Sequence, residues 1–165
     1  MDGDWIESKD QSDKGIRLIQ TGNIGNGVFK DKEKNHHYIS EDTFRKLNCT
    51  EIFPGDILVS RLPEPVGRSC EIPDIKTKMI TAVDCTIIRL EKECIDKKYF
   101  CYFTQSNNYF SQVSDLCAGT TRKRISKMNL VQVCVPLPPL AEQKRIASKI
   151  ESLFSVLDAM EKECD

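Results

Sequence analysis

The chain has 165 residues and a formal net charge of −1, with 39% hydrophobic and 30% charged side chains. This length and composition predict a soluble protein with one modest core, in a domain of about 140 residues followed by a helix. The sequence contains no run of about 18 apolar residues and no charged-then-apolar start. These features argue against a membrane span and a signal peptide, and we expect a cytoplasmic protein.

Eight cysteines raise the question of a disulfide scaffold. Several lie within apolar runs, as in AVDCTII and VQVCVPL, where cysteine behaves as a small core residue. No CxxC pair occurs, and His36 and His37 have no cysteine at zinc-site spacing. We therefore expect reduced, mostly buried thiols, with no metal and no other cofactor.

The first third of the chain combines a strand, a glycine-rich loop and a short helix. IRLIQ, residues 16–20, predicts a strand, and the run Gly22–Gly27 predicts tight turns and close backbone approach. No helical pattern follows directly, so this run is not a dinucleotide-binding fingerprint. Ser40, which precedes two acidic residues, is typical of an N-cap and predicts a short helix through Leu47.

The middle of the chain alternates strand and helix signals. A Pro-Gly-Asp turn leads into the strand ILVSR, and the apolar stretch Met79–Leu90 predicts a second long strand. Asp96 can cap a helix whose apolar side chains lie mainly on one face, namely Tyr99, Phe100, Phe103, Phe110 and Val113. LVQVCVP predicts a last strand. The order predicts an α+β fold with a twisted, mixed and partly antiparallel sheet.

A proline-rich connector and a helix with heptad spacing close the chain. Pro139 is a plausible first helical residue, because the N–H that proline lacks would be unpaired there. Apolar side chains then recur in steps of four and three, at Ile146, Ile150, Leu153, Leu157, Met160 and Cys164. This is the spacing that turns one helix face towards a partner helix. The alternative is an amphipathic helix packed on its own domain. We divide the chain into a globular part, 1–135, and a connector with helix, 136–165.

Charge is distributed unevenly along the sequence. Residues 1–13 carry a balance of −4 and residues 141–165 a balance of −2, whereas residues 14–140 carry +5. The basic excess therefore lies in the globular part, where a surface that binds nucleic acid would need it to displace counterions from phosphates.

The connector also carries a resemblance to a known family. PLPPLAEQKRIASKIESLF is similar to the segment that closes a target recognition domain in the DNA specificity (S) subunits of type I restriction–modification systems. The family run P-L-P-P-L-x-E-Q-x-x-I is matched by Pro136, Leu137, Pro138, Pro139, Leu140, Glu142, Gln143 and Ile146. Gly119–Pro138 resembles the last loop and strand of the family, and Phe53–Ile72 resembles its mid-domain strand–turn–strand.

The resemblance implies recognition of double-stranded DNA as half of a specificity subunit. Methyl transfer would belong to modification (methyltransferase) subunits, and cleavage to a restriction subunit that joins through them. One S subunit normally carries two recognition domains held apart by antiparallel helices. This chain has one, and it starts at MDGDWIESKD without the usual helix-and-strand opening. A natural half-subunit, a cropped fragment and a broken gene are the alternatives. A half-subunit would form a homodimer through the helix or pair with a second recognition domain.

Three segments carry candidate DNA contacts. The first is the basic run Gly119–Lys127, the second the loop from Arg61 to Arg68, and the third the loop Thr21–Tyr38. Lys and Arg pair phosphates, Arg can bind a guanine edge, and Asn can bind adenine. The candidates are Thr120, Thr121, Arg122, Lys123, Arg124, Lys127, Arg61, Arg68, Asn23, Asn26, Lys30 and His36. A solvated basic turn and a polar surface loop are the alternatives for the first and third segments.

Catalytic motifs are missing from the sequence. It has no Walker loop, no G-x-S-x-G elbow and no HExxH, and we expect no catalytic residue. The rival hypothesis is a coiled-coil interaction module without a DNA role, which gains if the Arg122–Lys127 loop lies away from the other two segments. A metal-dependent nuclease is a third hypothesis, weakened by the dispersed carboxylates.

Overall fold

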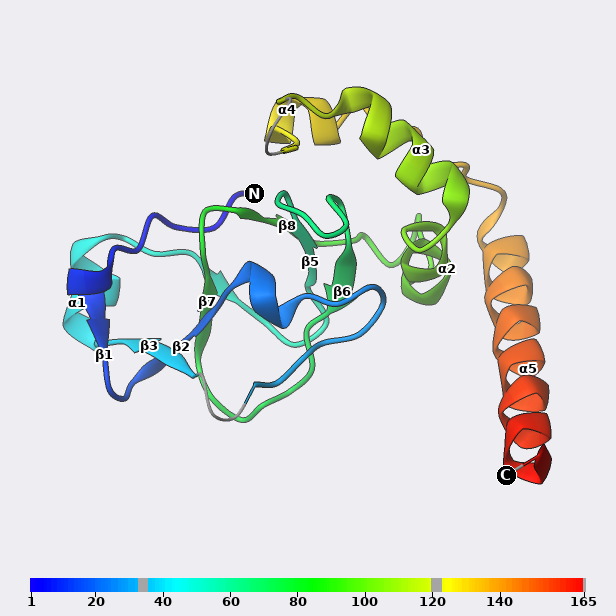
Figure 1. Cartoon of the computed structure of the whole chain (residues 1–165), viewed down its shortest axis with the longest axis horizontal. Coiled ribbons are helices and arrows are strands. Elements are labelled where there is room, and N and C mark those ends of the chain that lie inside the picture. Colours follow the sequence, from blue (N-terminus) through cyan, green and yellow to red (C-terminus); the bar gives the residue numbers. More distant parts are fainter. Residues whose placement is uncertain (33–35, 120–122, 165) are drawn as a thin grey trace.

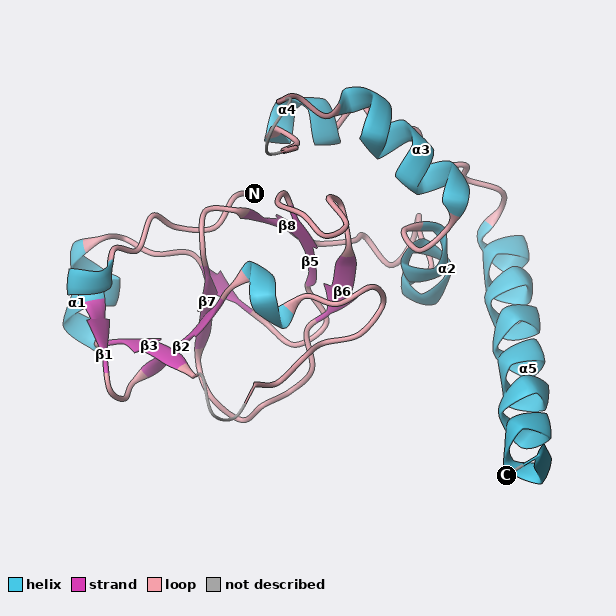
Figure 2. Cartoon of the chain, viewed as in Figure 1, coloured by secondary structure: helices cyan, strands magenta, loops and turns pink. Residues whose placement is uncertain are grey.

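The computed structural model describes residues 1–32, 36–119 and 123–164, without the side chains of residues 163 and 164. Two small sheets lie side by side, three helices form an arc beside them, and one long helix projects from the end of that arc (Figures 1 and 2). The fold is α+β with mixed strand directions, as predicted from the sequence.

Five of the described strands form the first sheet, in the order β1-β3-β2-β7-β4. Their bounds are β1 Gln11–Ser12, β2 Ile16–Ile19, β3 His37–Ile39, β4 Glu51–Ile52 and β7 Met79–Thr81. β2 and β7 run parallel, and the other pairs are antiparallel. β2 is the IRLI segment predicted as a strand, and all four of its side chains are buried.

Three further described strands form the second sheet, which is antiparallel with the order β6-β5-β8. They are β5 Ile57–Ser60, β6 Ser69–Glu71 and β8 Cys85–Ile88. The N-terminal residues extend this sheet, because Met1 and Ile87 exchange backbone hydrogen bonds across the edge of β8. The turn between β5 and β6 holds the second candidate segment, residues 61–68.

Short helices begin at the capping residues that local sequence supplies. α1 Glu41–Lys46 is capped by Ser40, α2 Lys97–Phe103 by Asp96, α3 Asn107–Leu116 by Ser106, and α4 Lys127–Leu130 by Ser126. In each case the side-chain oxygen accepts a hydrogen bond from a backbone N–H in the first turn, which satisfies a donor that would otherwise lack a partner. Two single-turn 3₁₀ helices, η1 Ser8–Asp10 and η2 Thr21–Asn23, precede and follow β2.

The core has three parts. Ile19, Leu58 and Met79 belong to a cluster that joins the two sheets. A second cluster is formed mainly by residues of the first sheet and includes Ile16 and Ile80. The third lies between the second sheet and the helical arc, where Val59 contacts side chains that include Phe103. β2 and β5 are buried along their whole length, which explains why apolar residues occupy both of their faces instead of alternating with exposed polar ones; Arg17 in β2 and Ser60 in β5 are the exceptions in residue type.

Three predictions about elements are corrected. Met79–Leu90 is not one strand, since the chain turns at residues 82–84 and passes from β7 in one sheet to β8 in the other. The helix predicted after Asp96 is two helices, α2 and α3, because Ser106 caps a new start. LVQVCVP is not a strand: Leu130 ends α4, and residues 131–135 are irregular.

The long helix α5 spans Leu140–Cys164, one residue after the predicted start, and the Pro139 carbonyl accepts from the backbone N–H of Glu142 at 2.8 Å and Gln143 at 3.1 Å. Among the described residues, no helix is long and apolar enough to cross a membrane.

Candidate nucleic-acid interface

The turn between β5 and β6 is the point where the three candidate segments meet. Ile125 of the basic segment donates its backbone N–H to the Arg61 carbonyl at 3.2 Å. On the other side, Gly27 donates its backbone N–H to the Ser69 carbonyl at 2.8 Å. Gly27 belongs to the glycine-rich loop, which is residues 21–30 of the third candidate segment. Segments around residues 25, 65 and 125 therefore adjoin in the fold.

Arg68 is the main link between this turn and the glycine-rich loop. Its side chain is buried, and its Nε donates to the Ile24 carbonyl at 2.7 Å while Nη2 donates to the Thr21 carbonyl at 2.8 Å. Nη1 donates to the carbonyls of Leu62 at 2.7 Å and Pro65 at 3.0 Å. Four of its five N–H groups are thus used within the protein. Burial lowers the Arg68 pKa, but a guanidinium remains charged at neutral pH.

Arg61 is also buried and bonded to backbone. Its Nη2 donates to the Val83 carbonyl, and its backbone N–H donates to the Asp84 carbonyl at 2.9 Å. Both arginines were predicted to contact DNA. In the structure both side chains are buried, and contact with a duplex would require Arg68 to break four hydrogen bonds to backbone carbonyls, whereas Arg61 makes one such side-chain bond, to Val83. Arg68 therefore links the turn between β5 and β6 to the glycine-rich loop, and Arg61 links it to the turn at residues 82–84.

The basic segment presents cations to solvent. Lys123 is exposed, and Arg124 is 54% exposed with its Nη2 3.4 Å from Asp84. Lys127, at the start of α4, lies 3.9 Å from Asp2. The backbone of Arg124 pairs with Ala118 at 2.9 and 3.0 Å, which closes the loop at its base. The predicted contacts Thr120, Thr121 and Arg122 lie outside the described residues.

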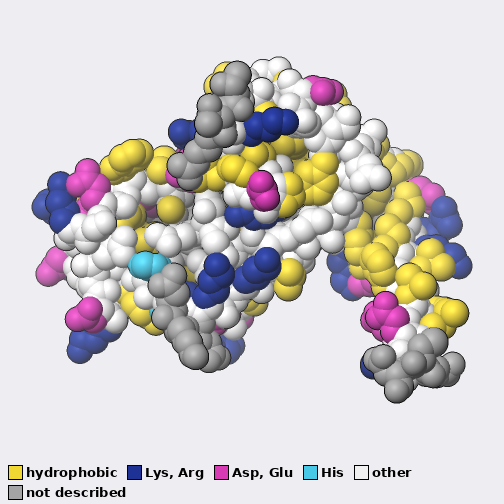
Figure 3. Space-filling view, in the orientation of Figure 1, with side chains coloured by type: hydrophobic (Ala, Val, Ile, Leu, Met, Phe, Trp, Pro, Cys, Tyr) yellow, Lys and Arg dark blue, Asp and Glu magenta, His cyan; other side chains and the backbone are white. Residues whose placement is uncertain are grey.

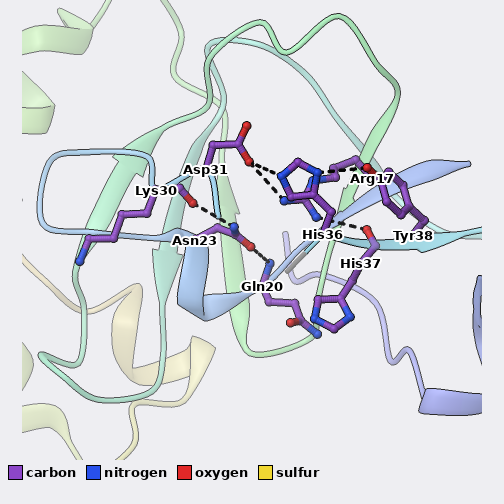
Figure 4. Close-up of polar contacts among 8 residues, drawn as sticks. All are labelled: Arg17, Gln20, Asn23, Lys30, Asp31, His36, His37 and Tyr38. Carbon is purple, nitrogen blue, oxygen red and sulfur yellow. Dashed lines mark hydrogen bonds and ion pairs between the residues drawn. The ribbon is translucent and has the colours of Figure 1, made fainter. Parts of the chain in front are cut away.

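The glycine-rich loop divides its predicted residues between interior and surface (Figure 4). Asn23 is buried: its Oδ1 accepts from the Gln20 N–H at 3.0 Å, and its Nδ2 donates to the Lys30 carbonyl at 3.0 Å. The side chains of Asn26 and Lys30 are exposed. Asn23 therefore holds the shape of the loop, whereas Asn26 and Lys30 face solvent.

His36 belongs to a polar network under this loop. Its Nε2 lies 2.8 Å from Asp31 Oδ1 and its Nδ1 lies 3.1 Å from the Tyr38 hydroxyl (Figure 4). Arg17, which is only 2% exposed, reaches the same carboxylate at 3.4 Å and lies 5.6 Å from the Tyr38 ring centroid. Sequence reasoning missed Arg17, although a cation inside the apolar run IRLI was the available signal.

The exposed charges around the turn between β5 and β6 are mostly positive. Exposed cations come from two separate segments, with Lys30 and Lys32 on one and Lys123 and Arg124 on the other. Figure 3 shows Lys and Arg side chains above and below a central patch of hydrophobic side chains. Glu64 is an exposed acid within the turn between them. Exposed Lys and Arg side chains are the groups that can pair with DNA phosphates.

Among the described residues, no group of three His, Cys, Asp or Glu side chains could hold a metal ion. Burial raises the pKa of Cys70 to about 12 and that of Cys85 to about 11. Both thiols are therefore protonated at neutral pH and unsuited to act as nucleophiles.

Gln143 attaches the first part of α5 to the domain. From the sequence, this residue was identified only as part of the family motif. Gln143 is buried; its Oε1 accepts from the Asp96 N–H at 2.9 Å, and its Nε2 donates to the carbonyls of Pro138 at 2.8 Å and Cys94 at 3.2 Å. Ala147 is 3% exposed, and this end of the helix packs on α2.

The predicted helix interface is divided between two environments. Ile146 and Ile150 are half-buried on the domain itself, which matches the alternative of an own-domain helix. Leu153, Leu157 and Met160 are each more than half exposed. The coiled-coil prediction for this distal part stays a prediction, since the structure contains one chain.

Comparison with known proteins places this geometry in a family. Residues 2–164 match the model of the type I restriction modification DNA specificity domain, and the chain belongs to that family. The EcoKI specificity subunit of Escherichia coli K12 is 29% identical over 147 residues, covering 87% of this chain and 30% of its own length. The MjaVIII specificity subunit of Methanocaldococcus jannaschii is 24% identical over 165 residues, covering 98% of this chain and 38% of its own.

The fold is likewise shared with a solved structure. A chain from work on complex assembly and conformational transition of the type I R-M system superposes with a TM-score of 0.69 at 19% identity. That match covers 99% of this chain and 37% of the other. The chain therefore spans about a third of the length of the relatives it matches.

Proposed function

We propose that this chain reads sequence in double-stranded DNA, using the surface around residues 61–68, as the recognition part of a type I specificity subunit. The observation that carries this proposal is the meeting of three separately predicted segments at one turn. Exposed Lys30 lies on one side of that turn and exposed Lys123 on the other. An interaction module without a DNA role has no need of this convergence.

In the proposed mechanism, exposed cations position the duplex and polar side chains read it. Lys30, Lys32, Lys123 and Arg124 pair with phosphates, which sets register without reading sequence. Asn26 is exposed at the tip of the glycine-rich loop, and its amide can form paired hydrogen bonds with an adenine edge in the major groove. The buried bonds beneath the loops keep these groups in place, so that little ordering entropy is lost on binding.

Catalysis is assigned to partners. The relatives are named as specificity subunits, and by that likeness the chain is not an enzyme: methyl transfer falls to modification subunits and cleavage to the restriction subunit that joins them. These systems act on DNA inside the cell, so the proposed location is the cytoplasm.

We further propose that residues 1–135 form the recognition domain and residues 136–165 the connector and spacer helix. The 25 residues of α5 span about 38 Å at 1.5 Å per residue, close to one turn of B-DNA, about 34 Å. The exposed side chains of Leu153, Leu157 and Met160 would be covered by a second recognition domain or by a second copy of the chain. Such a frame would set the spacing between two half-sites.

Co-expression with a modification subunit tests the proposal. Host DNA is sequenced for methylated adenines with the chain present and absent. A new split motif supports a specificity subunit, and a palindromic motif indicates that two copies act together. A complex that purifies intact but methylates no new motif would contradict sequence reading by this chain.

A further inference from the structure

We infer that Arg68 is a positioning residue for base reading: it locks the glycine-rich loop to the turn between β5 and β6 without touching DNA. This inference rests on the proposed DNA reading. Its basis is the geometry of one guanidinium that donates to four carbonyls at 2.7–3.0 Å, two in each segment. The segments are separated by about forty residues of sequence, and Arg68 joins them directly.

The chemistry of the contact requires arginine. A guanidinium is planar and presents its N–H donors in a fixed fork, so its carbonyl partners are held at set angles to one another. A lysine ammonium has three donors at a single point and cannot reach Thr21 and Ile24 while also reaching Leu62 and Pro65. Arg68→Lys therefore keeps the charge and releases at least one of the two segments.

Other bonds fix the turn on its remaining sides, and the glycine-rich loop is tied to it by Arg68 at Thr21 and Ile24 and to the start of β6 by the Gly27 N–H bond to the Ser69 carbonyl at 2.8 Å. The Tyr109 hydroxyl donates to the Gly67 carbonyl at 2.8 Å, which ties the turn to α3. Gly67 has a φ of +87° and donates its N–H to Ser60 at 2.8 Å. Because the turn is anchored in this way, the Arg68 bonds to Thr21 and Ile24 hold the glycine-rich loop in a fixed position relative to the turn.

The Arg68 link also fixes the positions of the exposed polar residues on the glycine-rich loop, Asn26 and Lys30. Asn26 follows Ile24 by two residues, and Lys30 is held by Asn23, whose carbonyl accepts the Lys30 N–H at 2.8 Å. A loop freed from Arg68 would still present its cations to phosphates, because those contacts tolerate displacement. Paired hydrogen bonds to a base edge do not tolerate it. Loss of Arg68 should therefore reduce sequence selection more than overall DNA binding.

The test uses the full chain in complex with its modification subunit, and a pool of random-sequence duplexes as the probe. Wild type, Arg68→Lys and the control Arg45→Lys, an exposed arginine on α1, are compared at a temperature well below each melting transition. Binding to the most enriched duplex is measured against binding to the unselected pool. Hydrogen exchange of the free chain is measured at residues 21–30 and in the strands of the second sheet.

The expected result for Arg68→Lys is a loss of about tenfold or more in the ratio of selected to unselected binding, the discrimination of roughly one paired base contact. The salt dependence of binding to the unselected pool should stay at the wild-type slope, and exchange should rise at residues 21–30 alone. If Arg68→Lys does not fold, Tyr109→Phe releases the turn from α3; because the loop takes its position from that turn through Arg68, selection should fall by a smaller factor, and exchange should rise in the turn as well as at residues 21–30.

Three results separate failure of this inference from failure of the proposed function. Unchanged selection and unchanged exchange in Arg68→Lys would overturn the positioning role while leaving DNA reading in place. A wild-type complex that enriches no sequence would overturn DNA reading and with it the positioning role, even where exchange at residues 21–30 rises in the variant. A fall in stability with an unchanged selection ratio would make Arg68 purely structural.

Discussion

Removal of the exposed cations at positions 123 and 124 should flatten the salt dependence of DNA binding. Each phosphate contact that a protein makes contributes about 0.9 to the slope of log affinity against log salt. Loss of two contacts in Lys123→Ala/Arg124→Ala therefore lowers the slope by about 1.8, which corresponds to roughly twelvefold over a fourfold rise in salt. Nη2 of Arg124 also lies 3.4 Å from Asp84, and this ion pair reduces the contribution of Arg124 to the slope. The slope should therefore fall by between about 0.9 and 1.8.

The assay is a fluorescence-anisotropy titration of a labelled duplex at about 50 and 200 mM salt, the range over which contact number is best resolved. Arg45→Ala/Lys46→Ala is the matched control, because it removes the same charge from exposed positions on α1, away from the basic segment (Figure 1). The control should lower the slope much less. Equal slopes for wild type and the 123/124 variant, or equal losses in both variants, would refute the assignment of this segment to the DNA surface.

Three further predictions concern the helix and the thiols. Leu157→Glu should abolish a dimer formed through the distal face of α5, measured by sedimentation, whereas Ser155→Glu on the opposite face should not; a dimer that survives Leu157→Glu removes this face from the account. Gln143→Met should cost about 1–3 kcal/mol in unfolding free energy and raise hydrogen exchange at the start of α5, because buried partners of the amide are left unsatisfied. At pH 8 an alkylating reagent should modify exposed Cys94 quickly and Cys70 only after unfolding, since burial raises the Cys70 pKa and so lowers its thiolate fraction; rapid modification of Cys70 would contradict its burial.

Elements defined by local signals were predictable from sequence. The apolar run IRLI became β2, and Ser40 and Asp96 cap helices where their hydroxyl and carboxylate oxygens accept first-turn N–H groups. These features depend on a few neighbouring residues. They therefore follow from propensity and hydrogen-bonding capacity alone.

Elements set by distant contacts were not predictable in the same way. Nothing local marks residues 82–84 as the crossing between two sheets, because the break follows from the pairing of β7 with β2 and of β8 with β5. LVQVCVP has strand-like composition, but Ser126 starts a helix that takes its first residue, Leu130. Tertiary context overrides propensity at both places.

In the candidate site, too, features set by local sequence were predictable and features set by distant contacts were not. The three segments were found from their cations, glycines and asparagines, and the structure brings them together. The division of roles among the polar residues was not foreseen, because Arg68 and Asn23 look like surface groups until their carbonyl and amide partners are known. A buried polar side chain satisfied by distant backbone groups leaves no periodic signal in the sequence.

Protection of lysines from acetylation would locate bound DNA on the surface of this chain. The chain is acetylated briefly with and without a saturating duplex, and each lysine is quantified by mass spectrometry. DNA should protect Lys30, Lys32 and Lys123, the exposed lysines of the two cation-bearing segments, and should leave exposed Lys46 on α1 as reactive as before. Protection centred on Lys46, or unchanged reactivity at Lys30 and Lys123 with the duplex bound, would contradict DNA binding by these two segments.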